Sequence, residues 1–392
     1  MTIEKTQAVM EWNEAGKACK ARWRSENGTP PPKKVVIADD TLKADAAYRL
    51  ACEGTAFLWR GDFQNARQLL VAMSRRIDRK PRKTVLSGVE GPAVPGEAFN
   101  LHRQAQAQRA RVLATILIPL DAGYVIPLRR APDVAQACTE VYGKADDKLL
   151  TGHPGEVSVV SLREMLGLIG AHEWRKKGVE IAALGARIHP HYGVYSPVRG
   201  EYLELVNRAP LPTAELAFDI GTGTGVLGAL LVKRGVGRVV ATDQDERALV
   251  CARANLARLG YAQQVEVVQA DLFPAGRAPL IVCNPPWIPA RPSSAIEYAI
   301  YDPDSRMLRG FLSGLAAHLT PGGEGWLVIS DIAEHLGLRT RATLLAWIAA
   351  AGLRVREKHD IKPHHPKASD AGDPLHAARM AETTSLWRLV AQ

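Results

Sequence analysis

The chain has few cysteines, no long apolar run and no internal repeat, and these absences exclude several classes of protein. The five cysteines are widely spaced and include no CxxC pair, which disfavours a disulfide framework and a cysteine zinc site. No apolar run approaches the ~18–20 residues that a membrane span needs. The first residues, MTIEKTQAVMEWNEAGK, carry charges where a signal peptide needs an apolar segment. We therefore expect a cytoplasmic protein whose cysteines are free, buried thiols.

Length and composition indicate a globular protein of two or three domains. The chain has 392 residues, and a domain usually contains ~100–200. Hydrophobic residues make up 46% and charged residues 23% of the chain, which excludes a disordered chain and a collagen-like one.

The net charge of +9 lies entirely in the first half of the chain. Residues 1–200 contain 30 basic and 21 acidic residues, whereas residues 201–392 contain 20 of each. The basic residues concentrate at 75–83, 129–130 and 175–177. Such a half can contact nucleic acid or the ribosome, or it can be an ordinary solvated surface, and the sequence leaves both interpretations open.

The first half predicts an arm followed by a mainly helical (α+β) domain. Residues 1–35 are polar and end in TPPPKK, where three prolines interrupt any helix, so we expect an N-terminal arm there. Residues 36–184 are expected to form a substrate-recognition domain. Its helices are predicted at about 41–59 and 63–77, which together would make an αα-hairpin, at 101–111, and after residue 161.

Two local patterns refine this domain. Ser161 and Glu164 have the spacing of a capping box, so a helix should begin there. The stretch LATILIPLDAGYVIPL predicts two short strands at a sheet edge, because Pro119 and Pro127 cannot donate a ladder hydrogen bond.

From residue 185 onward, short β-rich runs alternate with amphipathic helices, which is typical of βαβ units and a parallel sheet. The predicted strands are 216–219, 238–242, 265–268, 280–283, 325–329, 353–358 and 385–390. Helices are predicted between them, for example at 246–259 and 306–319. We therefore predict a doubly wound α/β domain over 185–392 that ends in a strand pair. The connection at 361–383 is expected at the active-site end, as a lid, a substrate-contacting loop or a mere insertion.

A glycine-rich turn follows the first of these strands, in AFDIGTGTGVLGALL, with Gly221, Gly223 and Gly225. Glycines let a ligand approach the main chain closely, and the helix start presents free N–H groups. The spacing GxGxG differs from the dinucleotide fingerprint GxGxxG, and Asp219 suits a cationic amino-acid moiety better than a pyrophosphate. Together with Thr222, these residues predict a site for S-adenosyl-L-methionine (SAM) rather than NAD.

Two further acids follow the next two strands in order. Asp243 ends the second strand, where a carboxylate can accept hydrogen bonds from both ribose hydroxyls. Asp271, in QADLF after the third strand, is placed to accept from the adenine amino group, with Leu272 and Phe273 as apolar walls. Each acid alone also fits a helix N-cap, but their order at the strand ends favours a cofactor site.

The most specific motif is IVCNPPWI at 281–288, directly after the fourth strand. Pro285 and Pro286 hold the backbone extended and rigid. The side-chain oxygen of Asn284 and the carbonyl of Pro285 can each accept one hydrogen from a planar –NH₂ group, and Trp287 offers a face for stacking. Two fixed acceptors aim the nitrogen lone pair at the SAM methyl group. We predict these four residues to be catalytic, and Asn284 also to border the cofactor.

Together, DIGTGTG, Asp243, Asp271 and NPPW resemble the class I SAM-dependent methyltransferases that methylate amino groups. That group includes adenine-N6 and cytosine-N4 nucleic-acid methyltransferases and the glutamine-N5 methyltransferases of release factors and ribosomal protein. The resemblance covers residues 185–392 and implies a seven-stranded Rossmann-like sheet with SAM as cofactor.

Within this group the glutamine enzymes are the nearest match. HPHYGVYSPVRGEYLELV (189–206) resembles the segment that precedes their glycine loop, and EYAIYDPDSRMLRGFL (297–312) resembles their acidic stretch after NPPY. The chain differs from them in having Trp287 in place of their usual tyrosine, SPVRGE in place of IPRPETE, and a longer N-terminal half.

The methyl acceptor stays open at this point. A protein glutamine is favoured by the two flanking segments, and a nucleobase by the basic first half and by tryptophan as a stacking platform. A small-molecule N-methyltransferase and a non-catalytic SAM-binding module are further alternatives.

No metal site is expected. The histidines His189, His191, His364, His365 and His376 lie in loop-forming surroundings, without a carboxylate or cysteine at ligand-like spacing. We interpret them as surface histidines.

Overall fold

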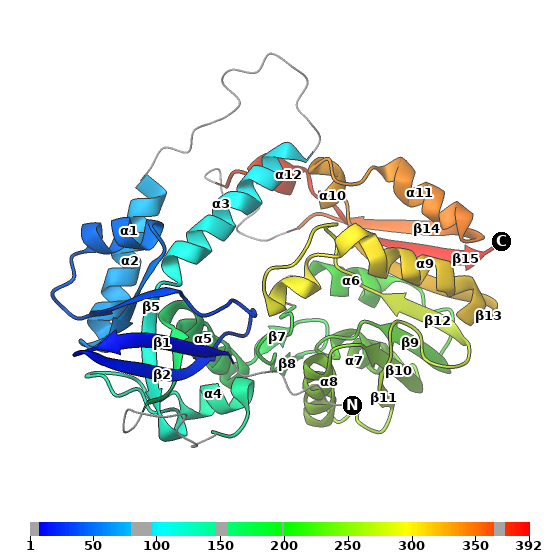
Figure 1. Cartoon of the computed structure of the whole chain (residues 1–392). Coiled ribbons are helices and arrows are strands. Elements are labelled where there is room, and N and C mark those ends of the chain that lie inside the picture. Colours follow the sequence, from blue (N-terminus) through cyan, green and yellow to red (C-terminus); the bar gives the residue numbers. More distant parts are fainter. Residues whose placement is uncertain (1–7, 80–95, 146–155, 198–199, 364–372) are drawn as a thin grey trace, which may run out of the picture. The chain divides into compact units, whose positions relative to one another are not determined.

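The computed structural model describes residues 8–79, 96–145, 156–197, 200–363 and 373–392. The chain forms two compact units, and Figure 1 shows the helices and strands of both. Unit 1 comprises Met1–Ala93 and Leu101–Glu173, and unit 2 comprises Val94–Asn100 and Trp174–Gln392. Within the described residues, the short segment 96–100 therefore belongs to the C-terminal unit, which the sequence did not predict.

Unit 1 is an α/β unit rather than a mainly helical domain. Its described part contains a six-stranded sheet in the order β1-β2-β6-β5-β4-β3. The strands are β1 (Val9–Glu14), β2 (Lys17–Arg24), β3 (Lys34–Ala38), β4 (Thr55–Trp59), β5 (Ile116–Asp121) and β6 (Glu156–Ser161). The pairs β2–β6, β3–β4 and β4–β5 are parallel, and the pairs β1–β2 and β5–β6 are antiparallel.

The helices of the first half are α1 (Ala44–Cys52), α2 (Phe63–Arg79), α3 (Glu97–Leu113), the 3-10 helix η1 (Ala122–Tyr124), α4 (Ala135–Tyr142) and α5 (Leu162–Lys177). The predicted helices at 63–77 and 101–111 are confirmed as α2 and α3. The start of α5 is confirmed as well, because the Glu164 amide donates to Ser161 Oγ at 3.1 Å. The Glu164 carboxylate accepts from the Tyr142 hydroxyl at 2.7 Å.

The predicted arm over residues 1–35 is wrong, because β1 and β2 form a hairpin and β3 begins at Lys34. Met10 and Trp12 in β1 pack with Cys19 in β2 in one apolar cluster. Alternate apolar residues in an otherwise polar stretch are enough for a strand with one buried face. The overall polarity of the stretch conceals this pattern.

The predicted helix at 41–59 is wrong in its second half, and the αα-hairpin is therefore wrong too. The helix α1 ends at Cys52, the chain turns at Gly54 (φ of 86°), and β4 follows. All five residues of β4 are buried. Periodicity cannot distinguish such a short apolar run from a buried helix.

The predicted pair of edge strands at 113–128 is replaced by one interior strand, β5, followed by η1. The strand β5 lies between β6 and β4, but its pairing with β4 ends at Leu117. Pro119 lies beyond this paired part, so its missing N–H removes no ladder hydrogen bond towards β4.

Unit 2 is built on a sheet whose seven described strands have the order β11-β10-β9-β12-β13-β15-β14. The strands are β9 (Leu216–Ile220), β10 (Arg238–Asp243), β11 (Val265–Gln269), β12 (Ala278–Cys283), β13 (Leu319–Ser330), β14 (Leu353–Ile361) and β15 (Thr384–Ala391). Neighbours are parallel except that β15 is antiparallel to both β13 and β14. Each predicted strand range lies within one of these strands. A separate antiparallel pair is formed by β7 (Val179–Ile181) and β8 (Ala186–Ile188).

Helices cover both faces of this sheet (Figure 1). They are α6 (Glu201–Arg208), α7 (Val226–Lys233), α8 (Glu246–Leu259), α9 (Arg306–His318), α10 (Ile332–His335), α11 (Arg341–Ala350), α12 (His376–Ala381), and the 3-10 helices η2 (Ala295–Ala299) and η3 (Pro303–Ser305). Ala217 of β9 packs in the cluster that contains α6, α7 and α8, whereas its neighbour Phe218 packs in the cluster that contains α9 and α11. The helices predicted at 246–259 and 306–319 are α8 and α9. Within the described ranges, no helix has both the length and the apolar composition to cross a membrane.

All five cysteines are free thiols, but Cys52 is exposed rather than buried. Burial raises the pKa of Cys138 to about 12 and that of Cys251 to about 11. These two thiols are therefore protonated and unreactive at neutral pH.

Candidate active site

The glycine-rich turn after β9 is the first part of the candidate site. The amides of Gly221 and Thr222 donate to the carbonyl of Thr242 at 2.9 and 2.8 Å, which fixes the turn against the end of β10. Gly221 has a φ of 73°, and a Cβ atom there would collide with the Met307 side chain. Glycine at this position therefore keeps the main chain of the turn within reach of a ligand.

Asp219 lies in β9, and its side chain is fully buried. Its Oδ2 accepts from the Thr222 hydroxyl at 2.6 Å and from the Gly228 amide at 3.0 Å, which ties the turn to α7. Its Oδ1 has no hydrogen-bond partner among the described residues. Burial, together with the smaller effect of the charge of Asp243, raises the pKa of Asp219 to about 6. An unpartnered buried oxygen suits a cationic ligand group such as the ammonium of SAM.

Asp243, the last residue of β10, contacts the glycine-rich turn directly. Its Oδ2 accepts from the Gly223 amide at 3.0 Å, and its Oδ1 accepts from the Asp245 amide at 3.0 Å. Burial raises the pKa of this carboxyl. These amides orient the carboxylate, whose two oxygens together have more acceptor positions than the backbone amides occupy.

Asp271, after β11, lies at the surface in an ion pair with Arg306 of α9, with Oδ2 2.6 Å from the guanidinium. Both side chains are more than half exposed. The next residue, Leu272, has a φ of 78° and accepts a hydrogen bond from the Thr242 hydroxyl on its carbonyl at 2.5 Å. Phe273 stacks on Phe311 and His318 of α9, so it belongs to the packing of that helix. An adenine amino group would share Asp271 with Arg306.

The acceptor loop, residues 284–287, starts beside the glycine-rich turn. Cys283 at the end of β12 lies opposite Ile220 at the end of β9. Trp287 Nε1 donates to Asn284 Oδ1 at 2.9 Å, which fixes the indole relative to the amide. A carbonyl oxygen has two acceptor positions, so Asn284 retains one for an incoming amino group.

The residues that follow hold the acceptor loop from its far end. Pro285 is buried and Pro286 partly exposed. The Ile288 amide donates to the Ile300 carbonyl at 3.2 Å, and the Ile288 carbonyl accepts from the Asp302 amide at 2.9 Å. The end of the acceptor loop is thus hydrogen-bonded to the first part of the stretch 297–312, which resembles the acidic stretch of the glutamine enzymes.

Asp302 connects this pairing to α9. Its two carboxylate oxygens accept from the amides of Met307 and Leu308 at 2.9 and 3.1 Å, and burial raises its pKa. Asp304 and Ser305, between the acid and the helix, have φ of 55° and 52°, a strained conformation for residues other than glycine. An acid followed by proline ahead of a helix is an N-terminal signal that could have identified Asp302 from the sequence.

Arg339 is the second functional candidate that the sequence did not reveal. Its side chain is buried, and it donates to the Trp287 carbonyl at 3.4 Å and to Ser305 Oγ at 3.5 Å. Its Nε has no acceptor among the described residues, and burial lowers its pKa. The guanidinium therefore joins the acceptor loop to the start of α9. No local sequence pattern links residues 52 positions apart.

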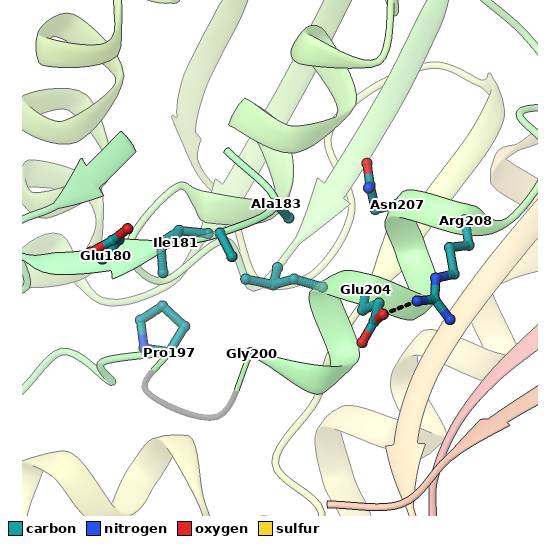
Figure 2. A pocket seen from close by; sticks show the side chains of 10 residues that line it. Glu180, Ile181, Ala183, Pro197, Gly200, Glu204, Asn207 and Arg208 are labelled. Carbon is teal, nitrogen blue, oxygen red and sulfur yellow. Dashed lines mark hydrogen bonds and ion pairs between the residues drawn. The ribbon is translucent and has the colours of Figure 1, made fainter. Parts of the chain in front are cut away.

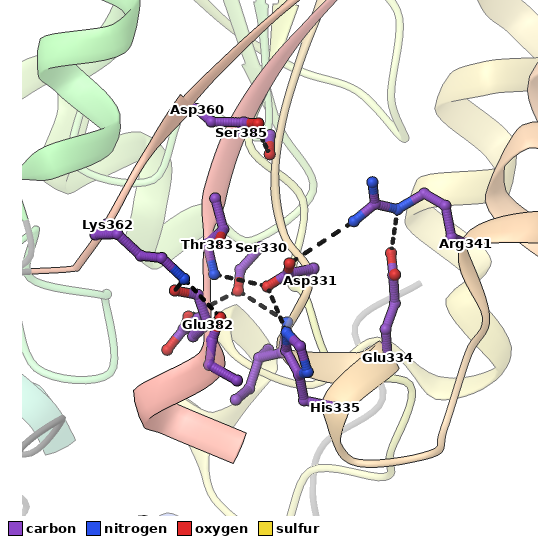
Figure 3. A network of polar contacts seen from close by, with 12 residues as sticks. Ser330, Asp331, Glu334, His335, Arg341, Asp360, Lys362, Glu382, Thr383 and Ser385 are labelled. Carbon is purple, nitrogen blue, oxygen red and sulfur yellow. Dashed lines mark hydrogen bonds and ion pairs between the residues drawn. The ribbon is translucent and has the colours of Figure 1, made fainter. Parts of the chain in front are cut away.

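The ends of the connection 361–383 are fastened to the end of β13 (Figure 3). Lys362 Nζ donates to the Ala381 carbonyl at 2.8 Å, and Ser330 Oγ donates to the buried Glu382 carboxylate at 2.7 Å. The Thr383 amide donates to Asp331 at 2.6 Å. The strand β13 is the neighbour of β12, so the end of the connection is held one strand away from the strand that leads into the acceptor loop.

Two surface hollows of about 510 Å³ each lie in unit 2. The first is lined by the turn after β7 and by the outer side of α6, including Glu204 and Arg208 (Figure 2), and none of the predicted site residues lines it. The second is lined by the start of α9 and includes Arg306, the partner of Asp271.

The histidines show no metal arrangement in the part of the chain that the structure describes. His189 bonds through Nδ1 to the Arg175 carbonyl at 2.7 Å, and the His191 amide donates to the Cys251 sulfur at 3.4 Å. The predicted surface histidines at 364 and 365 lie outside the described residues.

Comparisons with known proteins agree with this geometry. Residues 187–341 match the family described as "Methyltransferase small domain". A release factor glutamine methyltransferase from Cereibacter sphaeroides is 34% identical over 197 residues, which cover 46% of this chain and 66% of that protein. A ribosomal protein L11 methyltransferase from Pelotomaculum thermopropionicum is 29% identical over 232 residues, with coverages of 53% and 67%. A tRNA1(Val) (adenine(37)-N6)-methyltransferase from Shewanella sp. (strain W3-18-1) is 25% identical over 136 residues, with coverages of 32% and 57%.

The chain thus spans about two thirds of the length of these relatives, or less. The matches confirm the resemblance that the glycine-rich turn and the NPPW motif predicted. Residues 187–341 match a methyltransferase small domain, and this part of the chain is similar to class I SAM-dependent methyltransferases.

Proposed function

We propose that the chain transfers a methyl group from SAM to a planar amino nitrogen of a macromolecule, in the first place the side-chain amide of a protein glutamine. The observation that carries this proposal is that the acceptor loop and the glycine-rich turn start side by side, at Cys283 and Ile220. The glutamine acceptor is supported by the release factor glutamine methyltransferase among the relatives and by the acidic stretch paired with the acceptor loop.

In this proposal the carboxyl edge of the sheet holds the cofactor. Bound SAM supplies an electrophilic methyl group on a sulfonium sulfur. The free Oδ1 of Asp219 accepts from its ammonium group, Asp243 accepts from its ribose hydroxyls, and Asp271 accepts from its adenine amino group beside Leu272. The glycines at 221, 223 and 225, with Thr222, let the main chain approach it.

The acceptor loop then positions the nitrogen. The remaining acceptor position of Asn284 and the carbonyl of Pro285 hold the two N–H groups, and Trp287, fixed by its bond to Asn284, covers the face of the amide. Pro286 keeps the loop extended. Orientation of this kind can lower a barrier by roughly 7–11 kcal/mol. Both acceptors are neutral, so the proton displaced from nitrogen passes to water.

A second candidate acceptor is the amino group of an RNA or DNA base. Trp287 is a large stacking platform, and the excess of basic over acidic residues lies in the half of the chain that contains unit 1. A tRNA adenine-N6 methyltransferase is also among the relatives. In either case we propose that unit 1 recognises the acceptor and that a translation-linked acceptor places the enzyme in the cytoplasm.

The first experiment is to incubate the purified chain with methyl-tritiated SAM and separate pools of protein, RNA and DNA. Label on glutamine in the protein pool supports the first candidate, and label in nucleic acid supports the second. Label confined to lipid or small metabolites contradicts both.

The second experiment removes the proposed acceptor group. Asn284→Ala is expected to lower turnover by about 100-fold or more, the usual effect of losing one preorganised polar contact. SAM affinity should change by less than about threefold in the same variant. Asn207→Ala, on the exposed side of α6, is the matched control. Normal turnover in Asn284→Ala would show that the acceptor pocket is assigned wrongly.

A further inference from the structure

The first turn of α3 lies in unit 2, outside the residues that match the methyltransferase family. Phe99 in this turn is 3% exposed and belongs to an apolar cluster with Ile332 of α10 and Leu336, the residue that follows α10. Trp287, Ile288 and Tyr301 pack against the same cluster.

The contact between Phe99 and Tyr301 is specific. Their ring centroids lie 6.3 Å apart with an interplanar angle of 66°, an edge-to-face arrangement. Gly96, with a φ of 80°, brings the backbone so close to the segment after α10 that a Cβ atom there would lie 2.9 Å from the Leu338 side chain. The segment 96–100 thus packs closely against Tyr301 and the segment after α10.

Tyr301 is the residue through which Phe99 reaches the acceptor loop. Ile288 pairs with Tyr301 in an isolated parallel bridge, and its backbone bonds with both neighbours of Tyr301, Ile300 and Asp302. Ile288 directly follows Trp287. We therefore expect a shift of the Tyr301 ring to move the backbone of Ile288, which adjoins Trp287.

We propose that Phe99 is a positioning residue for the acceptor loop, supplied by the helix that continues at residue 101 into unit 1. The proposal rests on the proposed function for its catalytic consequence. In this proposal the first turn of α3 helps to position Trp287 through Tyr301, whereas the rest of α3 belongs to unit 1.

The test compares Phe99→Ala and Phe99→Leu with the control Leu101→Ala, an exposed position on the same helix. The first readout is amide hydrogen exchange in the full-length protein. In Phe99→Ala the amides of Ile288 and Asp302 should exchange at least about tenfold faster, with amides of β9 and β10 unchanged. Phe99→Leu, which keeps the apolar volume, should show a smaller increase of the same pattern. Leu101→Ala should change neither.

The second readout is methyl transfer to the labelled pool. The kcat of Phe99→Ala should fall about 10- to 100-fold while its SAM affinity changes less than threefold. Unchanged hydrogen exchange at the Ile288 and Asp302 amides in both Phe99 variants would overturn the proposal. A loss of SAM affinity as large as the loss of kcat would overturn it too. If Phe99→Ala does not fold, the exchange pattern of Phe99→Leu decides. If the wild-type protein methylates none of the pools, the proposed function is refuted. The hydrogen-exchange comparison still tests whether Phe99 positions the acceptor loop.

Discussion

Asp219→Asn should separate what the buried carboxylate does for stability from what it does for ligand binding. Burial raises the pKa of Asp219 to about 6, from an ordinary value of 3.8. Because the folded state holds this proton more tightly than the unfolded chain, the stability of the wild type falls as pH rises from about 4 to 6 and then levels off. At about 1.36 kcal/mol for each pKa unit, the total loss is about 3 kcal/mol.

Asparagine cannot ionise, so the variant does not lose this stability as pH rises. Its side-chain oxygen can still accept from Thr222 and from the Gly228 amide, as Oδ2 of Asp219 does. Its amide group costs about 1–3 kcal/mol if it is left unpaired, but that cost does not depend on pH. The difference in stability between variant and wild type should therefore grow by about 3 kcal/mol in favour of the variant between pH 4 and pH 8.

The assay is thermal unfolding of the full chain at a series of pH values, with the transition of unit 2 followed separately. A unit of this size shifts its Tm by about 2–4 °C per kcal/mol, so the Tm difference should grow by about 6–12 °C. SAM affinity of the variant should fall at least about tenfold, because an amide N–H replaces the free acceptor. Asp245→Asn, which keeps an N-cap residue on α8, is the control. A Tm difference that is the same at every pH would refute the desolvation argument.

Three further substitutions test single contacts of the site. Trp287→Phe removes the donor to Asn284 Oδ1 and should lower methyl transfer about tenfold with SAM affinity unchanged in calorimetry; transfer at the wild-type rate would show that this bond does not orient the acceptor. Arg306→Ala releases Asp271 from its exposed ion pair and should tighten SAM binding by up to about fivefold, whereas tenfold weaker binding would contradict the role of Asp271. Arg339→Met replaces a buried cation by an apolar side chain, so Tm should be unchanged or higher while methyl transfer slows about tenfold. Its control is Arg341→Met, which removes an ion pair to Glu334. Equal slowing of methyl transfer in both variants would show that Arg339 has no special role at Trp287.

The sequence predicted those parts of the fold and site that depend on local patterns. The strands of unit 2 are short apolar runs bounded by turns, and Asp219, Asp243 and Asn284 follow from their places at strand ends. Parallel strands bring such residues to one edge whatever the packing details. The same reasoning failed for β1 and β2, where a strand is half polar, and for β4, where a short apolar run fits a helix as well.

Other contributions to the site come from distant parts of the chain and could not be predicted. Phe99 contacts the cluster at the acceptor loop from outside residues 187–341, and Arg339 contacts Trp287 from the segment between α10 and α11. The ion pair between Asp271 and Arg306 arises only when α9 packs beside the end of β11. Tertiary packing decides all three, and no local spacing records it.

We propose that a sulfonium cofactor binds at the carboxyl edge of β9 to β12, with its methyl group facing the acceptor loop. A crystal structure of the full chain with S-adenosylhomocysteine, the product after methyl transfer, tests it most directly. We expect the ribose hydroxyls to bond to Asp243, the amino group to bond to Asp219, and the sulfur to be directed towards Asn284. An adenosyl ligand bound elsewhere, or no binding at saturating concentration, would contradict it.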